Sequence, residues 1–358
     1  MNNTVIYSVN DLPVQQNRVY EGLSEAVNCP RGRLTLVQDD TTGIVHNASF
    51  RPDLIIYDEH YQNEQGYSSV FLQHLDRVVE VILRHFEGKS ILEIGCGKGL
   101  FLERLRMRGF SVIGIDPAYE GDAPYILKKH FSASLGVRGD AVILRHVLEH
   151  IPDPLNFLAA VREANGGKGF VYIEVPCLDW IAEHRAWFDI YYEHVNYFRL
   201  ADFFRLFGTV KETGRFFGGQ YFYVVADLST LHFAPEKEYG GFHLPDDFLA
   251  GLDRAVAKIE NGKGRKNVLW GGASKGVIFA IQLLQRGGIK PDFVIDINPA
   301  KQDKYLPVTG LPVLSPEKGL HILKEGDAIF VMNSNYFTEI QSTAGSRYTY
   351  YKVDENEF

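Results

Sequence analysis

Hydrophobic residues recur along this chain with two different spacings, which together predict a sheet covered by helices. Short apolar runs at 91–94, 111–115, 141–144, 170–175 and 221–226 are typical of buried strands. Between them, apolar residues recur every three or four positions, most clearly over 70–85, where Phe71, Leu75, Val78 and Ile82 share one helix face. This alternation predicts an α/β fold whose core is a doubly wound, Rossmann-like sheet.

The same order of strand, glycine turn, helix and strand begins again near residue 265. There, 268–270 lead into a turn at 271–276, a helix that ends near 284 and a strand at 293–296. With 358 residues, the chain is also long enough for two or three domains. We therefore expect a small N-terminal subdomain over 1–69, a Rossmann-like domain over 70–230, a linker and helix over 231–264, and a second Rossmann-like domain over 265–358.

The N-terminal subdomain contains two informative patterns. Apolar runs at 33–37 and 43–47 flank a polar turn and predict a β-hairpin. Residues 57–69 are polar and rich in tyrosine, and two interpretations remain open for them. They form either a solvated loop or a lid over the site of the domain that follows.

Charge and composition narrow the range of partners. A net charge of −8 without any basic run argues against nucleic acid or an anionic membrane surface. There is no apolar stretch of membrane-spanning length, and the N-terminus lacks the features of a signal peptide, so we expect a cytoplasmic protein. The three cysteines, Cys29, Cys96 and Cys177, are too few for a four-cysteine zinc site.

The clearest ligand signature is the glycine loop after the strand at 91–94. Gly95, Gly97 and Gly99 permit a tight turn and a close approach of backbone N–H groups to a ligand. A dinucleotide fingerprint would have its third glycine one position later. Glu93 precedes the first glycine by two residues, which favours a ligand with a cationic centre and no pyrophosphate. Asp116, at the tip of the next strand, is placed to accept the hydroxyls of a ribose.

This glycine loop, followed by a crossover helix and a strand-terminal aspartate, resembles the class I S-adenosylmethionine-dependent methyltransferases. The resemblance implies that the loop holds the methionine part of S-adenosylmethionine and that Asp116 holds its ribose. The alternative is a glycine turn that binds no ligand. The cofactor contacts expected on this basis are Glu93, Gly95, Gly97, Gly99, Asp116, Pro117, Arg145, His146, Tyr61 and Gln65.

The densest group of chemically active residues is 191–198, which follows the strand at 170–175 and is expected to cover the cofactor site. His194 can act as a base near neutral pH, and Glu193 is a second acid or a hydrogen-bonding partner. Tyr191 and Tyr192 can donate hydrogen bonds to a developing oxyanion. The alternative is an aromatic core segment with a hydrogen-bonded histidine.

A metal site is not expected. His146 and His150 are four residues apart, a spacing that can present two imidazoles on one helical face. Neither a cysteine nor a third histidine nearby completes a ligand set, and Pro152 and Pro154 leave little regular helix there.

A narrower resemblance rests on motifs in both halves of the chain. Tyr-x-Glu-His-x-x-Tyr-Phe at 191–198 and Arg-His-Val-Leu-Glu-His at 145–150 resemble the sugar C-methyltransferases that act on nucleotide-linked 4-ketosugars. The turn at 218–220 resembles their Gly-Gly-Ser. Residues 271–276, Asp296, Lys301 with 305–307, and 339–340 resemble their C-terminal substrate-binding domain. Gly272 replaces that family's alanine, and the four cysteines of its N-terminal zinc domain are missing.

This resemblance implies a mechanism and a substrate site. His194 would remove the hydrogen beside a ketone, and the enolate, held by Tyr191, Tyr192 or His150, would attack the sulfonium methyl group without any metal. Lys275, Lys301 and Lys304 would contact phosphate, although on sequence alone Lys301 and Lys304 would be surface lysines. The implied contacts to the nucleotide-linked sugar are Gly219, Gln220, Gly272, Ser274, Lys275, Asn298, Lys301, Lys304, Asn335 and Tyr336.

Three other functions remain possible at this stage. The cofactor domain alone does not separate carbon methylation from methylation of an oxygen or nitrogen of a small metabolite. The pattern Gly271-x-Ala273-x-x-Gly276, with Asp296 twenty residues on, is a degenerate dinucleotide motif that would suit an oxidoreductase. The third is a cofactor-binding protein without catalysis.

Overall fold

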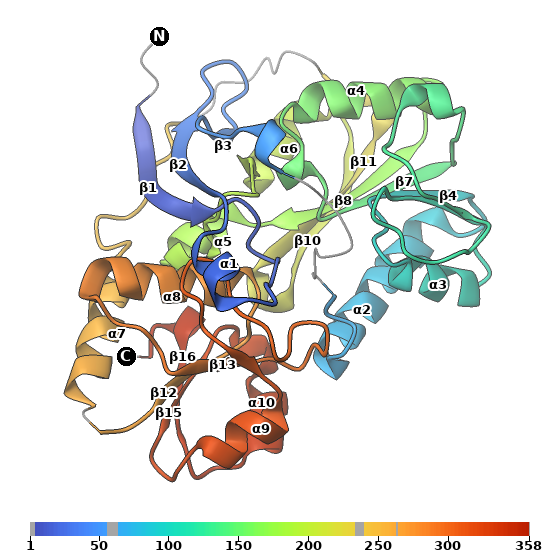
Figure 1. Cartoon of the computed structure of the whole chain (residues 1–358). Helices are drawn as coiled ribbons and strands as arrows, with labels where there is room; N and C mark the ends of the chain where they lie inside the picture. Colours follow the sequence, from blue (N-terminus) through green and yellow to red (C-terminus); the bar gives the residue numbers. More distant parts are fainter. Residues whose placement is uncertain (1–3, 56–63, 233–239, 263, 358) are drawn as a thin grey trace.

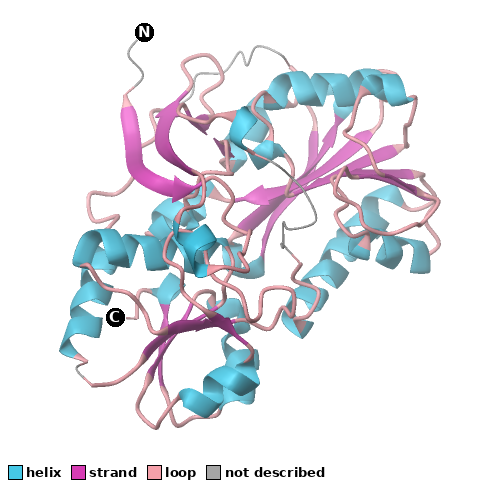
Figure 2. Ribbon diagram, viewed as in Figure 1, coloured by secondary structure: helices cyan, strands magenta, loops and turns pink. Residues whose placement is uncertain are grey.

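The strands of the computed structural model form three sheets (Figure 1), and the structure describes residues 4–55, 64–232, 240–262 and 264–357. The predicted α/β, Rossmann-like fold is confirmed. Figure 2 shows helices on both faces of the two larger sheets. None of the helices in these four stretches is both long and apolar enough to cross a membrane.

The first sheet belongs to the N-terminal part of the chain and has the order β1-β2-β3-β9. Its strands are β1 (Val5–Pro13), β2 (Arg31–Gln38), β3 (Val45–Asn47) and β9 (Asn196–Tyr197), and a short helix, α1 (Leu23–Val27), lies between β1 and β2. The predicted hairpin is confirmed, because β2 and β3 pair antiparallel with Leu36 opposite Asn47. The fourth strand comes from the predicted catalytic segment, which no local pattern indicated.

The second sheet has the order β10-β11-β8-β7-β4-β5-β6. Its strands are β4 (Ile91–Ile94), β5 (Val112–Ile115), β6 (Ile126–Leu127), β7 (Ala141–Arg145), β8 (Phe170–Pro176), β10 (Val210–Phe216) and β11 (Tyr221–Asp227). The sheet is mixed, because β11 pairs antiparallel with both β8 and β10. Only four residues connect β10 to β11, which is too short for the crossover that parallel strands require.

Alternate residues of these strands face two layers of helices. Ile91 and Ile143 pack on α2 (Ser69–Phe86) and α3 (Leu100–Met107). Leu92 and Leu144 face the opposite layer, which contains α4 (Pro154–Ala164), α5 (Leu178–Glu183) and α6 (Leu200–Leu206). Strands buried on both faces explain the continuous apolar runs of the sequence.

The third sheet is parallel throughout, with the order β14-β13-β12-β15-β16. Its strands are β12 (Asn267–Trp270), β13 (Phe293–Ile295), β14 (Val313–Leu314), β15 (Ala328–Val331) and β16 (Thr349–Lys352), and its helices are α7 (Ala250–Asn261), α8 (Ser274–Gly287), α9 (Pro316–Ile322) and α10 (Phe337–Ala344). Trp187, which lies between the second sheet and α8, stacks on Phe279 of α8 with ring centroids 5.5 Å apart. This contact brings the ligand-binding ends of the two Rossmann-like sheets together.

Candidate active site

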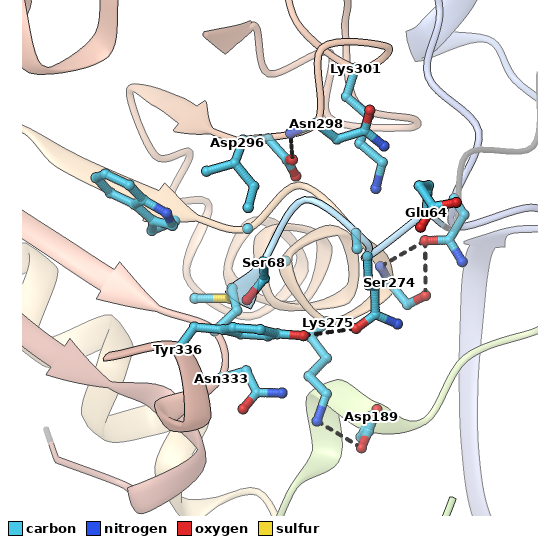
Figure 3. Close-up of a pocket in the computed structure, with 18 of the residues that line it drawn as sticks. Glu64, Ser68, Asp189, Ser274, Lys275, Asp296, Asn298, Lys301, Asn333 and Tyr336 are labelled. Atoms are coloured by element: carbon cyan, nitrogen blue, oxygen red, sulfur yellow. Dashed lines mark hydrogen bonds and ion pairs between the residues drawn. The ribbon is translucent and has the colours of Figure 1, made fainter. Parts of the chain in front are cut away.

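A cavity of about 480 Å³ lies between the second and third sheets. From the methyltransferase-like half it is lined by residues that follow β7 and β8, and from the C-terminal half by the turn and helix that follow β12 (Figure 3). The residues that line this cavity include Asn17, Gln65, Ser68, His146, Glu149, His150, Asp189, Tyr191, His194, Tyr221, Ser274, Lys275, Asp296, Asn298, Lys301, Tyr336 and Glu339.

The glycine loop after β4 has the conformation that the sequence predicts. Gly95, Gly97 and Gly99 have φ values of 76°, 55° and 81°, in the left-handed region that favours glycine. A Cβ atom at Gly95 would lie 2.4 Å from Val147, whereas one at Gly97 would meet nothing within 4 Å. The space above Gly97 is therefore open for a ligand.

Two carboxylates flank this loop. Asp116 accepts the N–H of Gly97 at 2.7 Å and that of Ala118 at 2.8 Å, which fixes its carboxylate at the end of β5. Glu93 is buried, and its Oε2 has no hydrogen-bond partner among the described residues. Burial raises the pKa of Glu93 to about 8, against the opposing effect of Arg145. A cation placed beside Glu93 would relieve this unfavourable burial.

The predicted cofactor contacts Arg145 and His146 are held by a buried carboxylate. Glu174 of β8 accepts from Arg145 at 3.1 Å and lies 3.2 Å from Nε2 of both His146 and His74. Burial alone would raise the pKa of Glu174, but Arg145 and His74 outweigh it and hold that pKa well below the usual range. Burial likewise opposes the charge on His146, yet Glu149 and Glu174 raise its pKa to about 9. His146 is therefore a cation at neutral pH.

Three of the five predicted catalytic residues line the cavity together. The His194 ring lies 4.0 Å from the ring of Tyr191 and 5.0 Å from that of His150. His194 is 4% exposed, and its Nδ1 has no hydrogen-bond partner in the described part of the chain. Burial and the neighbouring His150 hold the pKa of His194 well below its ordinary value. A buried, neutral imidazole that opens onto a cavity can accept a proton.

The other two predicted catalytic residues do not line the cavity. The hydroxyl of Tyr192 accepts the N–H of Arg51 at 3.0 Å, within the N-terminal part of the chain. The Glu193 carboxylate accepts the backbone N–H of Gln16. Because the segment has no regular hydrophobic period, its side chains could not be assigned to a face from the sequence alone.

His150 forms a group with Glu149 and His194 whose ligand atoms lie within 4.8 Å of one another. The pair considered from the sequence, His146 and His150, does not form such a group within the described residues. His150 donates from Nδ1 to the carbonyl of Glu193 at 3.1 Å, so in the neutral ring its Nε2 is an acceptor. This tautomer does not suit the enolate-stabilising role considered for His150.

The C-terminal half contributes the polar end of the cavity. Lys301 is 3% exposed, so it is not a surface lysine, and its Nζ lies 3.4 Å from the carbonyl of Gly272. Burial lowers the pKa of Lys301, an effect that Asp296 and Glu193 partly offset. Asp296 accepts the N–H groups of Gly272 at 2.7 Å and Asn298 at 2.8 Å. Ser274 begins α8, so its helix N-terminus faces this polar end.

Lys275 and Gln220 form part of a buried network between the two sheets. Lys275 lies 3.0 Å from Asp189 (Figure 3). It also donates to Gln220 at 2.8 Å. Gln220 in turn bonds Asn333 and Asp354. Both residues were predicted as substrate contacts. In the structure, their side chains form hydrogen bonds and an ion pair with other side chains of the same chain.

Of the other predicted site residues, some line the cavity, some do not, and Tyr61 lies outside the described residues. Tyr336 lines the cavity and donates to Gln65 at 2.8 Å, so these two close one side of it. Lys304 pairs with Glu21 at 3.1 Å and does not line the cavity, and Asn335 donates to the carbonyl of Phe217. The Gly219 turn packs against Trp180. Tyr61 lies outside the described residues, as does the first part of the predicted lid.

Several cavity residues were not predicted. Asn17 accepts from Ser274 N–H at 3.3 Å, and no motif in the first 50 residues marks it. Asp189 and Tyr221 each lie within two residues of a predicted site residue, which is the signal that could have found them. Glu149 belongs to the motif at 145–150 and was given no role.

Comparisons with known proteins place two domains on the chain. Residues 63–210 match the family model of the methyltransferase domain, and residues 250–349 match that of the C-methyltransferase C-terminal domain. The chain is 24% identical over 333 residues to C-methyltransferase NovU of Streptomyces niveus, a match that covers 81% of this chain and 77% of that protein.

Two further comparisons each cover less than half of this chain. A ubiquinone biosynthesis O-methyltransferase of Cereibacter sphaeroides is 37% identical over 92 residues, which are 22% of this chain and 37% of that protein. The solved structure of an S-adenosylmethionine dependent methyltransferase from Mesorhizobium loti covers 44% of this chain and 100% of its own, at a TM-score of 0.34 and 12% identity.

The glycine loop meets the chemical requirements of S-adenosylmethionine. Open space above Gly97 admits the ligand, the unpartnered Oε2 of Glu93 offers a buried negative site to a cationic centre, and Asp116 stands where a ribose diol would bind. Gly95 and Gly99 complete the turn. These residues would hold the cofactor next to the cavity that contains His194.

Proposed function

We propose that this chain, which is an S-adenosylmethionine-dependent methyltransferase with a C-methyltransferase C-terminal domain, methylates the carbon beside the ketone of a nucleotide-linked 4-keto-deoxysugar. The observation that carries the proposal is the shared cavity. His194, a candidate base, and Lys301, a buried cation of the C-terminal half, line the same 480 Å³ space. Such a space admits a substrate with a reactive ketone at one end and an anionic handle at the other.

In this proposal His194 is the general base. Its neutral imidazole takes the proton from the carbon beside the ketone, and the electron pair of that C–H bond passes into the enolate. The hydroxyl of Tyr191 donates a hydrogen bond to the enolate oxygen. Nε2 of His150 accepts a hydrogen bond from a sugar hydroxyl. S-adenosylmethionine supplies, when bound, an electrophilic methyl group for which the enolate carbon is the nucleophile.

The C-terminal half is proposed to bind the nucleotide. The N-terminus of α8 presents backbone N–H groups, and Lys301 adds a buried positive charge, so a diphosphate is the ligand that this end favours. Asp296 and Asn298 lie at the tip of β13, where a ribose would be accepted. Lys275, whose charge is paired with Asp189, is assigned to joining the two halves of the chain rather than to a direct contact with phosphate.

The proposal is tested by incubating the protein with S-adenosylmethionine and a panel of nucleotide-linked 4-keto-6-deoxysugars. Mass spectrometry should detect one added methyl group, and NMR should locate it on the carbon beside the ketone. A methyl group on oxygen or nitrogen, or turnover of acceptors without a nucleotide, would instead assign the protein to the other class of methyltransferase.

A further inference from the structure

The N-terminal part of the chain pairs with, and forms hydrogen bonds to, the segment that contains His194. We call residues 191–197 the catalytic loop. Its last two residues form β9 and pair with β3, with His46 opposite Asn196 and Val45 opposite Tyr197. Asn47 adds a hydrogen bond from its N–H to the carbonyl of Val195 at 2.7 Å. The sheet of the first 50 residues therefore fixes the C-terminal side of His194.

The N-terminal side of His194 is fixed at two further points. Tyr192 is 1% exposed, its hydroxyl accepts the N–H of Arg51 at 3.0 Å, and its ring lies 5.5 Å from that of Phe50. The ring also covers Gly32, where a Cβ atom would come within 2.2 Å of it. Residue 32 must therefore remain glycine for Tyr192 to keep this position.

Glu193, the residue directly before His194, forms hydrogen bonds with Gln16. Its carboxylate accepts the N–H of Gln16, and its own N–H donates to the side-chain oxygen of Gln16 at 3.3 Å. The pair is reciprocal, and both residues are buried. The next residue, Asn17, accepts from the N–H and the hydroxyl of Ser274 at the start of α8. One short segment thus ties the catalytic loop to the C-terminal half.

From these contacts we infer that Glu193 is a positioning residue and that residues 4–51 act as the frame that orients His194. The inference deepens the proposed function, because it gives Glu193 a role other than that of the base. A buried carboxylate that already accepts a backbone N–H, and that does not line the cavity, does not reach a substrate carbon.

Two substitutions at Glu193 separate the positioning role from a catalytic one. Glu193→Gln keeps an oxygen that accepts the Gln16 N–H, so kcat should stay within about threefold of wild type. Glu193→Ala removes the acceptor, and kcat should fall by about 10²-fold with little change in the affinity for S-adenosylmethionine, as expected for a misplaced reacting group. Glu25→Ala, at an exposed position of α1, is the matched control.

A measurement without substrate distinguishes failure of this inference from failure of the proposed function. NMR titration of the His194 ring in the free protein should give the same curve for Glu193→Gln as for wild type. In Glu193→Ala the curve should move toward that of an ordinary histidine. If Glu193→Ala does not fold, Gln16→Ala takes its place and the same shift is expected. A Glu193→Gln variant as inactive as Glu193→Ala, or an unmoved His194 curve in both Glu193→Ala and Gln16→Ala, would overturn the inference.

Discussion

Asp116 and Asp296 occupy matching positions in the two Rossmann-like sheets. Each accepts, at 2.7 Å, the N–H of a glycine in the turn before it, and each accepts a second N–H, at 2.8 Å, from the residue two positions further on. The two turns differ in charge. Glu93 lies two residues before the first turn, and the equivalent residue before the second turn is Leu269. This difference suits a cation in the first site and an anion in the second.

The first prediction concerns Glu93 and cofactor affinity. Because the pKa of Glu93 is raised to about 8, its carboxyl group is protonated and neutral at pH 6 to 7. A cationic ligand favours the ionised form, so the affinity for S-adenosylmethionine should increase as the pH rises toward 8, by up to about tenfold per pH unit. Calorimetric titrations between pH 6 and 9 measure this. Glu93→Gln should bind more weakly, with a flatter pH dependence, whereas an equal slope in both proteins would contradict the assignment.

The second prediction concerns the pH dependence of catalysis. His194 must be neutral to act as a base, and burial together with His150 holds its pKa well below 6.5. With S-adenosylmethionine saturating, so that the titration of Glu93 does not enter, the acid limb of kcat/KM for the sugar should therefore lie below pH 6.5, and the rate should be constant from there to neutral pH. The pH–rate profile of the wild type checks this. An acid limb above 6.5 would mean that another group is the base.

The third prediction concerns added metal ions. Glu149, His150 and His194 can bring three ligand atoms within 4.8 Å of one another, and the two histidines are held neutral, as metal ligands must be. Zn²⁺ should therefore inhibit methyl transfer by occupying the base, and a chelator should reverse the inhibition. Glu149→Gln should weaken the inhibition by about tenfold or more. Loss of wild-type activity on chelation, with recovery on adding a divalent ion, would contradict the proposed mechanism.

The fourth prediction concerns the buried pair Lys275–Asp189. The two side chains are 15% and 7% exposed, so removing one charge leaves the other buried without a partner. Lys275→Met should lower the free energy of unfolding by about 3 kcal/mol in urea titrations. The double variant Lys275→Met/Asp189→Asn should lose less than the sum of the single variants.

The exposed pair Lys318–Asp303 provides the control for this measurement. Its side chains are 58% and 63% exposed, and Lys318→Met should change stability by less than about 1 kcal/mol. An equal loss of unfolding free energy in Lys275→Met and Lys318→Met would show that the buried pair stabilises the fold no more than the exposed pair does.

Local patterns were sufficient for the elements that the sequence predicted well. The face of α2 and the loop from β4 to α3 follow from apolar spacing and from glycines that need positive φ, so neighbouring residues decide them. β10 was missed because its residues Val210–Phe216 are polar and partly exposed, as is common in an edge strand. β1 and β9 depend on partners that are distant in sequence.

The candidate site, too, was predictable only where a local motif marks the residue. Gly95, Asp116 and His194 belong to local motifs, so the sequence alone could single them out. The direction of Tyr192 and Glu193 depends on the N-terminal sheet, and the pairing of Lys275 depends on Asp189. No local pattern of residues contains that information, because it arises from packing between segments more than 80 positions apart.

The most direct test of the central claim is solvent exchange at the carbon beside the ketone. The protein is incubated in heavy water with a nucleotide-linked 4-keto-6-deoxysugar and S-adenosylhomocysteine, and mass spectrometry follows deuterium uptake. The account predicts uptake with wild type and a loss of about 10²-fold or more in His194→Ala, which should still bind the cofactor. Uptake that persists unchanged in His194→Ala would contradict the account.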